Sequence, residues 1–407
     1  MFRQACRKRG PTGSNLRGRI CLLLLTIGVG VTSHTEAHGR TWHILNDGSG
    51  DAPTIQAGVD SAGARDTVLV SPGTYYENVV GVGSDISLLS CLGPAVTIID
   101  GSNQGRVVSV VGNARVEGFT IQNGFVVGDG AGIWVMGNEI RIRVTLVGNR
   151  IVGNRAGGSD QGLGGGIYLG RTIESVIKGN TIENNYAGDS GGGVYTFVGT
   201  SDELRSNTII ANGCHVGGGG VSCNSELTIV GNLIYDNYSD NFGGGIEGIA
   251  SAIIENTIVF NKINNSVNVW GAGIDIDAGS GPVRGNIIAF NHGPAGRETG
   301  AGISCDTSGS IIISCNDLWG NDLDYKLLSG CDTTSSGNIS GDPRFCSIDD
   351  FDFELDGSSP CAPGHAGNCG LIGAYPVGCG LVHTKETTWG HIKSIFQPSV
   401  GARGKRE

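Results

Sequence analysis

Residues 207–220 read NTIIANGCHVGGGG, and this pairing of an Asn-x-Ile-x-x-Asn phrase with a block of glycines decides the fold. The phrase occurs seven times, always with Ile or Leu at its third position. Successive copies begin 24 to 31 residues apart, and glycine-rich blocks keep the same period. Self-similarity at this period predicts a solenoid. The asparagine pairs are Asn149/Asn154, Asn180/Asn185, Asn207/Asn212, Asn232/Asn237, Asn256/Asn261, Asn286/Asn291 and Asn316/Asn321.

Each repeat holds two or three short runs of β-branched residues, separated by Gly or Asn and without a helical period. We therefore expect strands that pair in parallel with the copies above and below them, in a rod of about ten turns and on the order of 50 Å long. The Ile of each phrase should point inward. Asn should occupy the turns, because it tolerates left-handed backbone angles and its amide can bond to the Asn one turn away. Glycine should stand at corners where a Cβ would clash.

Both ends of such a rod expose strand edges and need a cover. Residues 54–64 place apolar side chains at helical spacing after Thr54, a residue suited to an N-cap, so a helix is expected at the first end. Short strands should follow, the first of them at 66–70. At the other end the repeat breaks at 341–345 and a cysteine-rich segment follows.

The chain divides into four parts. Residues 1–37 combine a basic lead with an apolar run and small residues near the end, which predicts a secretory signal peptide. The run is too short to cross a bilayer, so the mature chain should have no transmembrane segment and be secreted or held at the cell surface. Residues 38–345 are the predicted β-helix, 346–380 its cysteine-rich C-terminal cap, and 381–407 a basic and polar tail.

The charge excludes some partners. The net charge is −11, and it becomes −16 without the first 37 residues, which hold six basic residues and one acidic residue. A surface this acidic disfavours nucleic acid and anionic membranes.

The cysteines indicate an oxidising compartment. Ten remain after residue 37, and an even number in an exported chain predicts disulfides. Four of the ten fall within 346–379, where we expect bridges, and Cys214 and Cys223 are expected to close a loop. A zinc site is the alternative, although the spacings match no familiar ligand set.

Several phrases carry a family resemblance: TIQA at 54–57, DTVLVSPGTY at 66–75, EGFTI at 117–121, and the terminal DPRF at 342–345 with CGLIGA at 369–374. Together with the Asn/Gly repeats, they resemble the right-handed parallel β-helix proteins of the pectate-lyase-like superfamily, above all its exported bacterial repeat proteins of mostly unassigned role. The resemblance implies an all-β, right-handed parallel β-helix of three sheets with an N-terminal helical cap. It also implies a polysaccharide or cell-surface glycan as partner. Enzymes of the family cleave acidic or neutral polysaccharides by β-elimination or hydrolysis, whereas many members are not known to be enzymes.

A cluster of carboxylates is the main candidate for chemistry. If the first residue after each glycine block points inward, alternation turns the second and fourth outward. Glu247 should then lie beside Asp275, and Asp277 beside Asp306. Carboxylates at one strand spacing would suit a calcium ion, or acid–base catalysis through a raised pKa, with a solvated acidic face as the alternative.

The pectate lyases of the family combine such acidic clusters with an arginine base. Arg284 and Arg297 are near in sequence, but neither stands in a phrase that matches that motif, and the polygalacturonase-type phrases are absent. Three outward aromatic residues in the same column, Trp134, Tyr168 and Tyr195, are candidates for stacking on sugar rings, with packing on one another as the alternative.

These patterns favour an exported, non-catalytic, carbohydrate-associated binding protein. A polysaccharide lyase or glycoside hydrolase that uses the carboxylate cluster is the second hypothesis, and a purely structural protein the third.

Overall fold

The computed structural model describes residues 39–137, 141–158, 161–171, 173–199, 201–265, 270–277, 280–294, 300–333 and 337–379, and it leaves out the side chains of 225, 306–310 and 328–329. The predicted signal peptide and the polar tail lie outside these residues. Among them, no helix is long and apolar enough to cross a membrane.

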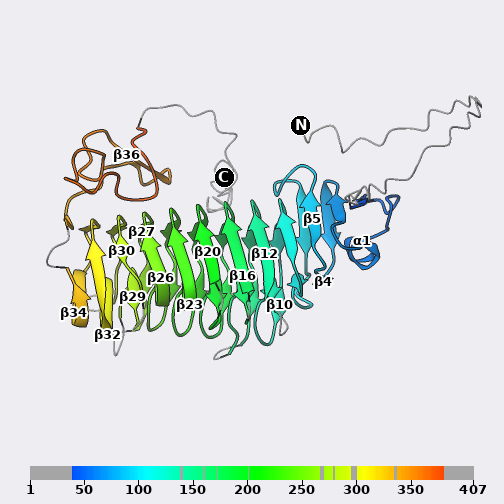
Figure 1. The fold of residues 1–407 in the computed structure, drawn as a ribbon, viewed down its shortest axis with the longest axis horizontal. Helices are drawn as coiled ribbons and strands as arrows, with labels where there is room; N and C mark the ends of the chain where they lie inside the picture. The colour runs from blue at the N-terminus through cyan, green and yellow to red at the C-terminus, as the bar shows by residue number, and fades with distance from the viewer. Residues whose placement is uncertain are drawn as a thin grey trace, which may run out of the picture.

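The chain coils into a parallel β-helix whose turns pass through three sheets in succession (Figure 1). In the described residues sheet B has ten strands, and at a spacing of ~4.8 Å they form a stack of roughly 45 Å, close to the expected length. Its strands are β3 (Gly73–Tyr76), β6 (Thr97–Asp100), β9 (Thr120–Gln122), β13 (Arg150–Val152), β17 (Thr181–Glu183), β21 (Thr208–Ile210), β24 (Leu233–Tyr235), β27 (Thr257–Val259), β31 (Ile287–Ala289) and β33 (Asp317–Trp319). Sheet C consists of β10 (Phe125–Val126), β14 (Arg155–Ala156), β18 (Tyr186–Ala187), β22 (Gly213–Cys214), β25 (Tyr238–Ser239) and β28 (Lys262–Ile263).

Sheet A contains two rows of strands, because most turns cross it with two strands in succession. The first row follows the glycine blocks and holds β4 (Val79–Val82), β7 (Val108–Val110), β11 (Ile133–Val135), β15 (Ile167–Leu169), β19 (Val194–Thr196) and β29 (Ile274–Ile276). The second row holds β1 (Thr41–Ile44), β2 (Thr67–Val70), β5 (Ile86–Ser90), β8 (Ala114–Glu117), β12 (Ile142–Val147), β16 (Ile173–Lys178), β20 (Ser201–Arg205) and β30 (Val283–Arg284). Four long strands run through both rows: β23 (Val221–Val230), β26 (Ile246–Ile254), β32 (Ala301–Ser314) and β34 (Leu323–Asp332).

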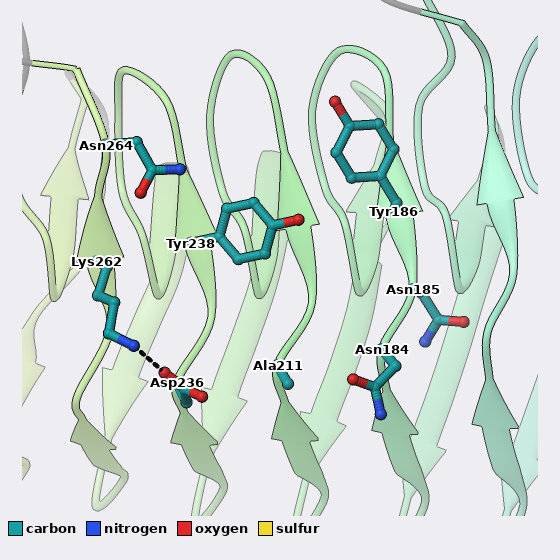
Figure 2. A pocket seen from close by; sticks show the side chains of 8 residues that line it. All are labelled: Asn184, Asn185, Tyr186, Ala211, Asp236, Tyr238, Lys262 and Asn264. Carbon is teal, nitrogen blue, oxygen red and sulfur yellow. Dashed lines mark hydrogen bonds and ion pairs between the residues drawn. The ribbon is translucent and has the colours of Figure 1, made fainter. Parts of the chain in front are cut away.

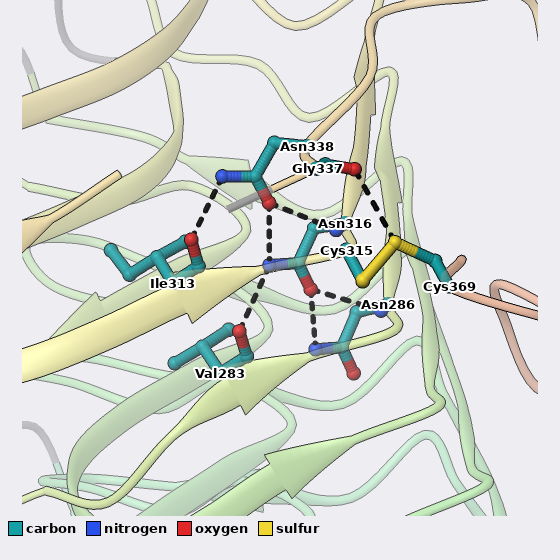
Figure 3. The surroundings of a disulfide bond; sticks show 8 residues. All are labelled: Val283, Asn286, Ile313, Cys315, Asn316, Gly337, Asn338 and Cys369. Atoms are coloured by element: carbon teal, nitrogen blue, oxygen red, sulfur yellow. Dashed lines mark hydrogen bonds between the residues drawn. A yellow bond between two sulfur atoms is a disulfide. The ribbon is translucent and has the colours of Figure 1, made fainter. Parts of the chain in front are cut away.

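The asparagines form two buried ladders, as the repeat predicts. The Oδ1 atom of Asn180 accepts hydrogen bonds from the backbone N–H of Asn149, at 2.9 Å, and from its Nδ2, at 3.1 Å. In turn, Nδ2 of Asn180 donates to the carbonyl of Leu146 at 2.9 Å. Figure 3 shows the same bonds continuing through Asn286, Asn316 and Asn338. Each amide thus binds the backbone of neighbouring turns, and the inward Ile of every phrase packs in one continuous core.

The expected reason for asparagine at the turns is wrong in one respect. The left-handed residue is the one immediately before each ladder asparagine, with φ between 51° and 69° in all seven repeats. These positions include side chains that avoid this conformation, such as Ala211 and Phe260, at a cost of about 1 kcal/mol each. The asparagine itself is needed for its amide, which must face inward at a corner where the backbone groups are buried.

The glycine blocks form the corner between sheet C and sheet A, where successive turns approach most closely. A Cβ placed on Gly192 would lie 2.3 Å from the carbonyl oxygen of Gly213 in the next turn. Backbone atoms cannot move aside as a flexible side chain can, so the corner requires glycine, as predicted.

Helix α1 (Ile55–Ser61) begins after Thr54, whose side chain accepts a hydrogen bond from the N–H of Ala57 at 3.0 Å. Ile55 and Val59 are buried against the first strands of sheet A. The predicted N-cap and the helix are therefore confirmed, and the helix is shorter than the 54–64 that the pattern suggests.

The cysteine-rich segment folds back along the outer face of sheet B. It contains the antiparallel pair β35 (Phe345–Ser347) and β36 (Asp352–Leu355), and its apolar residues pack on outward residues of β24, β27 and β31. The backbone N–H of Gly373 donates to the carbonyl of Gly285, and that of Ala374 to Oγ1 of Thr257. The segment therefore covers a flank of the rod across several turns.

Three disulfides lie in the C-terminal part of the described chain, which agrees with an oxidising, extracellular environment. One joins consecutive turns of sheet A, one fastens the cysteine-rich segment to the rod (Figure 3), and one closes the segment on itself. The bridges are Cys305–Cys331, Cys315–Cys369 and Cys346–Cys379. The expected loop disulfide between Cys214 and Cys223 is wrong, because both are free and buried. These two thiols point into the packed interior, where they serve as small apolar side chains.

Candidate functional site

One column of side chains runs along the outer face of the first row of sheet A, and we call it the outer column. Its members are in register on successive strands, each between two residues that face the core. They are Trp134, Tyr168, Tyr195, Ser222, Glu247, Asp275, Ser304 and Lys326. The prediction that the aromatic and acidic candidates share one column is therefore confirmed for the residues from Trp134 to Asp275.

The aromatic members pack on one another more than on solvent. The rings of Tyr168 and Tyr195 are stacked with centroids 5.6 Å apart and planes 1° from parallel, and only 5% and 6% of the two residues is exposed. The ring of Trp134 is half-buried, with the guanidinium of Arg106 4.9 Å from its centroid. The two tyrosines do not form the exposed platform that the sequence suggested, because their faces are occupied by each other.

Glu247 and Asp275 are in register on adjacent strands, as predicted. The pKa of Glu247 is raised to about 7, and burial is the largest cause. A hydrogen bond of 2.7 Å that Oγ of Ser222 donates to Glu247 lowers this pKa, but by less than burial raises it. Burial likewise raises the pKa of Asp275 to about 7, with repulsion from Asp277 and Glu247 as the next causes. Asp277 follows β29 on the exposed side, and partial burial raises its pKa as well. Near neutral pH this group therefore holds both protonated and ionised carboxyls.

The remaining charged candidates are placed differently. Asp306 belongs to β32, but its side chain is outside the described part, as is the whole of Arg297. Arg284 lies in β30 of the second row and pairs with β26 and β32 away from the outer column. Lys326 continues the column two strands beyond Asp275, and its ammonium lies 3.7 Å from the ring centroid of Trp270.

A calcium ion takes about six to eight oxygen ligands. In the part of the chain that the structure describes, no three His, Cys, Asp or Glu side chains come together as a metal site. The described carboxylates therefore supply only part of a calcium shell, and calcium binding stays a prediction.

A cleft of about 510 Å³ lies elsewhere, over sheet C and its corner with sheet B (Figure 2). Its lining includes Asn184, Tyr186, Asp236, Tyr238, Lys262 and Asn264. The sequence reasoning missed this site. The sequence nevertheless holds a signal for it. In five of the seven repeats the residue directly after the second asparagine begins a strand of sheet C and faces outward, and two of these five residues are tyrosines.

Comparison with known proteins supports the fold. No family model matches the chain, and no curated protein matches it. A solved structure described as pectate lyase Pel9A matches with a TM-score of 0.51 and 13% sequence identity, over 83% of this chain and 95% of that chain. At this identity the likeness concerns the fold and leaves the activity open. The chain therefore shares the parallel β-helix fold of that pectate lyase.

Proposed function

We propose that this protein is an exported, non-catalytic binding protein that holds a polysaccharide or cell-surface glycan along the outer column. The observation that carries the proposal is the register of that column, which sets polar groups side by side on successive strands. The likeness to the fold of a pectate lyase supports a carbohydrate as the partner.

The chemistry of the column suits the hydroxyls of a sugar chain. The phenol oxygen of Tyr195 accepts a hydrogen bond of 3.1 Å from the amide of Asn224, and Ser222 donates to Glu247. Hydroxyl groups and then carboxyl groups thus follow one another at ~4.8 Å intervals along the rod, with the amide of Asn224 beside them. Saccharide sites use a few such polar groups to fix orientation. The buried tyrosines contribute through their hydroxyl edges, since their ring faces are covered.

The test is binding of the purified protein to a panel of polysaccharides by affinity electrophoresis, with and without Ca²⁺. We expect retardation by at least one polysaccharide, reduced in a Glu247→Gln/Asp275→Asn double variant. Glu203→Gln is the matched control, because Glu203 is a carboxylate on β20, in the second row of the same sheet. Absence of binding to the whole panel, or equal binding by the double variant and the control, would refute the proposal. Loss of a Ca²⁺-dependent part of the binding in Asp275→Asn would support a calcium site.

A second candidate function is a glycoside hydrolase or polysaccharide lyase. It is favoured by Glu247 and Asp275, whose pKa values of about 7 suit a general acid and a general base. Their strand spacing of ~4.8 Å is also near the carboxyl separation of about 5–5.5 Å in retaining glycosidases. It ranks second because the one basic residue of the column, Lys326, stands two strands from Asp275 and packs on Trp270.

The same incubations decide between the two. New reducing ends or unsaturated products, abolished in Asp275→Ala, would establish the enzyme and overturn the non-catalytic proposal. Export rests on the basic and apolar N-terminal sequence and on the disulfides. Protein recovered from the medium of a bacterial host should begin near residue 38, and retention of the intact N-terminus in the cytoplasm would contradict export.

A further inference from the structure

The cleft over sheet C lies where one turn of the rod carries a glycine between turns with large outward side chains. In register, the outward residues of this sheet run Tyr186, Gly213, Tyr238 and Lys262. Gly213 leaves room for the ring of Tyr238, because a Cβ at this position would lie 2.1 Å from Cζ of that ring. The ring of Tyr238 therefore lies over the glycine, and the volume of about 510 Å³ is in the range of ligand sites.

The two tyrosine rings form an aromatic platform along the rod. Both residues are half-buried, and Figure 2 shows their rings nearly face-on, on turns that are two strand spacings apart. Two spacings correspond to ~9.6 Å between the Cα atoms of the two tyrosines. The rings are nearer to one another than this, because the ring of Tyr238 reaches over Gly213 on the turn between them. Both rings can therefore contact neighbouring sugars of a chain that runs parallel to the rod. The guanidinium of Arg155 lies over one face of the Tyr186 ring, 4.3 Å from its centroid, and leaves the other face for a ligand.

Polar groups line the cleft beside the rings. Asn184 and Asn264 are exposed, and the amide of Asn264 is held by Oδ1 of Asp240 at 3.0 Å. The ammonium of Lys262 lies 2.5 Å from Oδ1 of Asp236. The one acidic and the one basic side chain of the lining are thus paired with each other, and the lining has no net charge.

We propose that this cleft is a second binding site, for a neutral glycan that extends along the rod and stacks pyranose rings on Tyr186 and Tyr238. The amides and the Asp236–Lys262 pair would bond to its hydroxyls. A polyuronate is disfavoured because Lys262, the cation of the lining, is paired with Asp236 and the protein has a net charge of −11. This inference rests on the proposed function, since it assumes a carbohydrate partner, but it assigns the contact to a different face.

The test is isothermal titration calorimetry of the full chain with cellohexaose, xylohexaose, mannohexaose and, as the acidic probe, hexagalacturonate. We expect at least one neutral hexasaccharide to bind and hexagalacturonate to bind more weakly. The Tyr186→Ala/Tyr238→Ala variant should lose ~10-fold or more in affinity, as expected for two aromatic contacts. Tyr76→Ala is the matched control, because Tyr76 is an exposed tyrosine on β3 of sheet B, outside the row of outward residues that carries Tyr186 and Tyr238. Tyr186→Ala alone covers the case in which the double variant does not fold, as judged by circular dichroism.

The outcomes separate the two proposals. Binding of a neutral hexasaccharide that is lost in the tyrosine variants and kept in Glu247→Gln/Asp275→Asn supports a binding site in the cleft. Binding of a neutral hexasaccharide that is kept in the tyrosine variants and lost in the carboxyl variant refutes a binding site in the cleft. That result would still agree with the proposed function. Binding of hexagalacturonate alone overturns the neutral assignment. Binding of no saccharide overturns the proposed function and, with it, this inference.

Discussion

Raising the pH from 5 to 8 should destabilise this β-helix through the carboxyls of Glu247 and Asp275. Both have a folded-state pKa of about 7, above the ordinary values of 4.5 and 3.8. Between those values the folded chain binds more protons than the unfolded chain, so the free energy of unfolding falls with rising pH. The stabilising contribution is fully present below pH 4 and is lost once the pH has risen through 7.

The magnitude follows from the two shifts. Between pH 5 and 7 each of the two carboxyls lowers the free energy of unfolding by about 1.4 kcal/mol per pH unit, over about two units. The simple sum overstates the effect, because repulsion from the same carboxyl, Asp277, contributes to both shifts and both groups are partly exposed to water. Halving it gives roughly 3 kcal/mol between pH 5 and 8.

The assay is urea unfolding followed by far-ultraviolet circular dichroism at pH 5 and pH 8. Wild type should lose stability on going to pH 8, and Glu247→Gln/Asp275→Asn should lose about 3 kcal/mol less. Asp317, whose pKa burial raises to about 6, titrates in both proteins and cancels from the comparison. Glu203→Gln should behave as wild type. If the double variant shows the same pH dependence as wild type, the two carboxyls have ordinary pKa values in the folded protein. The hypothesis of acid–base catalysis by Glu247 and Asp275 would then lose its support.

Three further predictions concern the scaffold and the cleft. Asn237→Ala removes four ladder hydrogen bonds and should lower the free energy of unfolding by about 3–5 kcal/mol, against less than about 1 kcal/mol for the exposed Asn265→Ala; equal urea midpoints would contradict the ladder argument. Cys315→Ser releases the cysteine-rich segment from the rod and should cost about 2–4 kcal/mol, with faster cleavage between residues 341 and 379 in limited proteolysis; an unchanged cleavage pattern would show that packing alone holds the segment. Gly213→Ala should push the ring of Tyr238 aside and weaken saccharide binding in calorimetry without removing any polar group; an unchanged Kd would place the ligand elsewhere.

Much of the scaffold could be predicted from the sequence because its determinants are local and repeated. The period of the Asn and Gly phrases sets the number of turns, and Ile182 and its equivalents had to point inward for the core to close. Register along the rod then follows, which is why Glu247 and Asp275 were expected as neighbours and were found so. The Thr54 N-cap is predictable for the same reason, since capping depends on residues within one turn of helix.

Contacts between distant segments could not be predicted in this way. Cys315 pairs with Cys369 because the last segment returns over sheet B, and no spacing in the sequence reports that path. The prediction of a Cys214–Cys223 disulfide was wrong, because two inward side chains of a solenoid can be near in sequence and still be too far apart to form a bond.

By itself, then, the sequence determined the coil, its core and the list of residues that share a column. Only the tertiary structure decided which of those columns is open. Tyr168 and Tyr195 cover each other because like rings in adjacent turns stack, whereas Tyr186 and Tyr238 border a cleft because Gly213 separates them. Exposure depends on the side chains of neighbouring turns and on segments that pack over them, and a repeat pattern fixes the direction of a side chain without fixing what covers it.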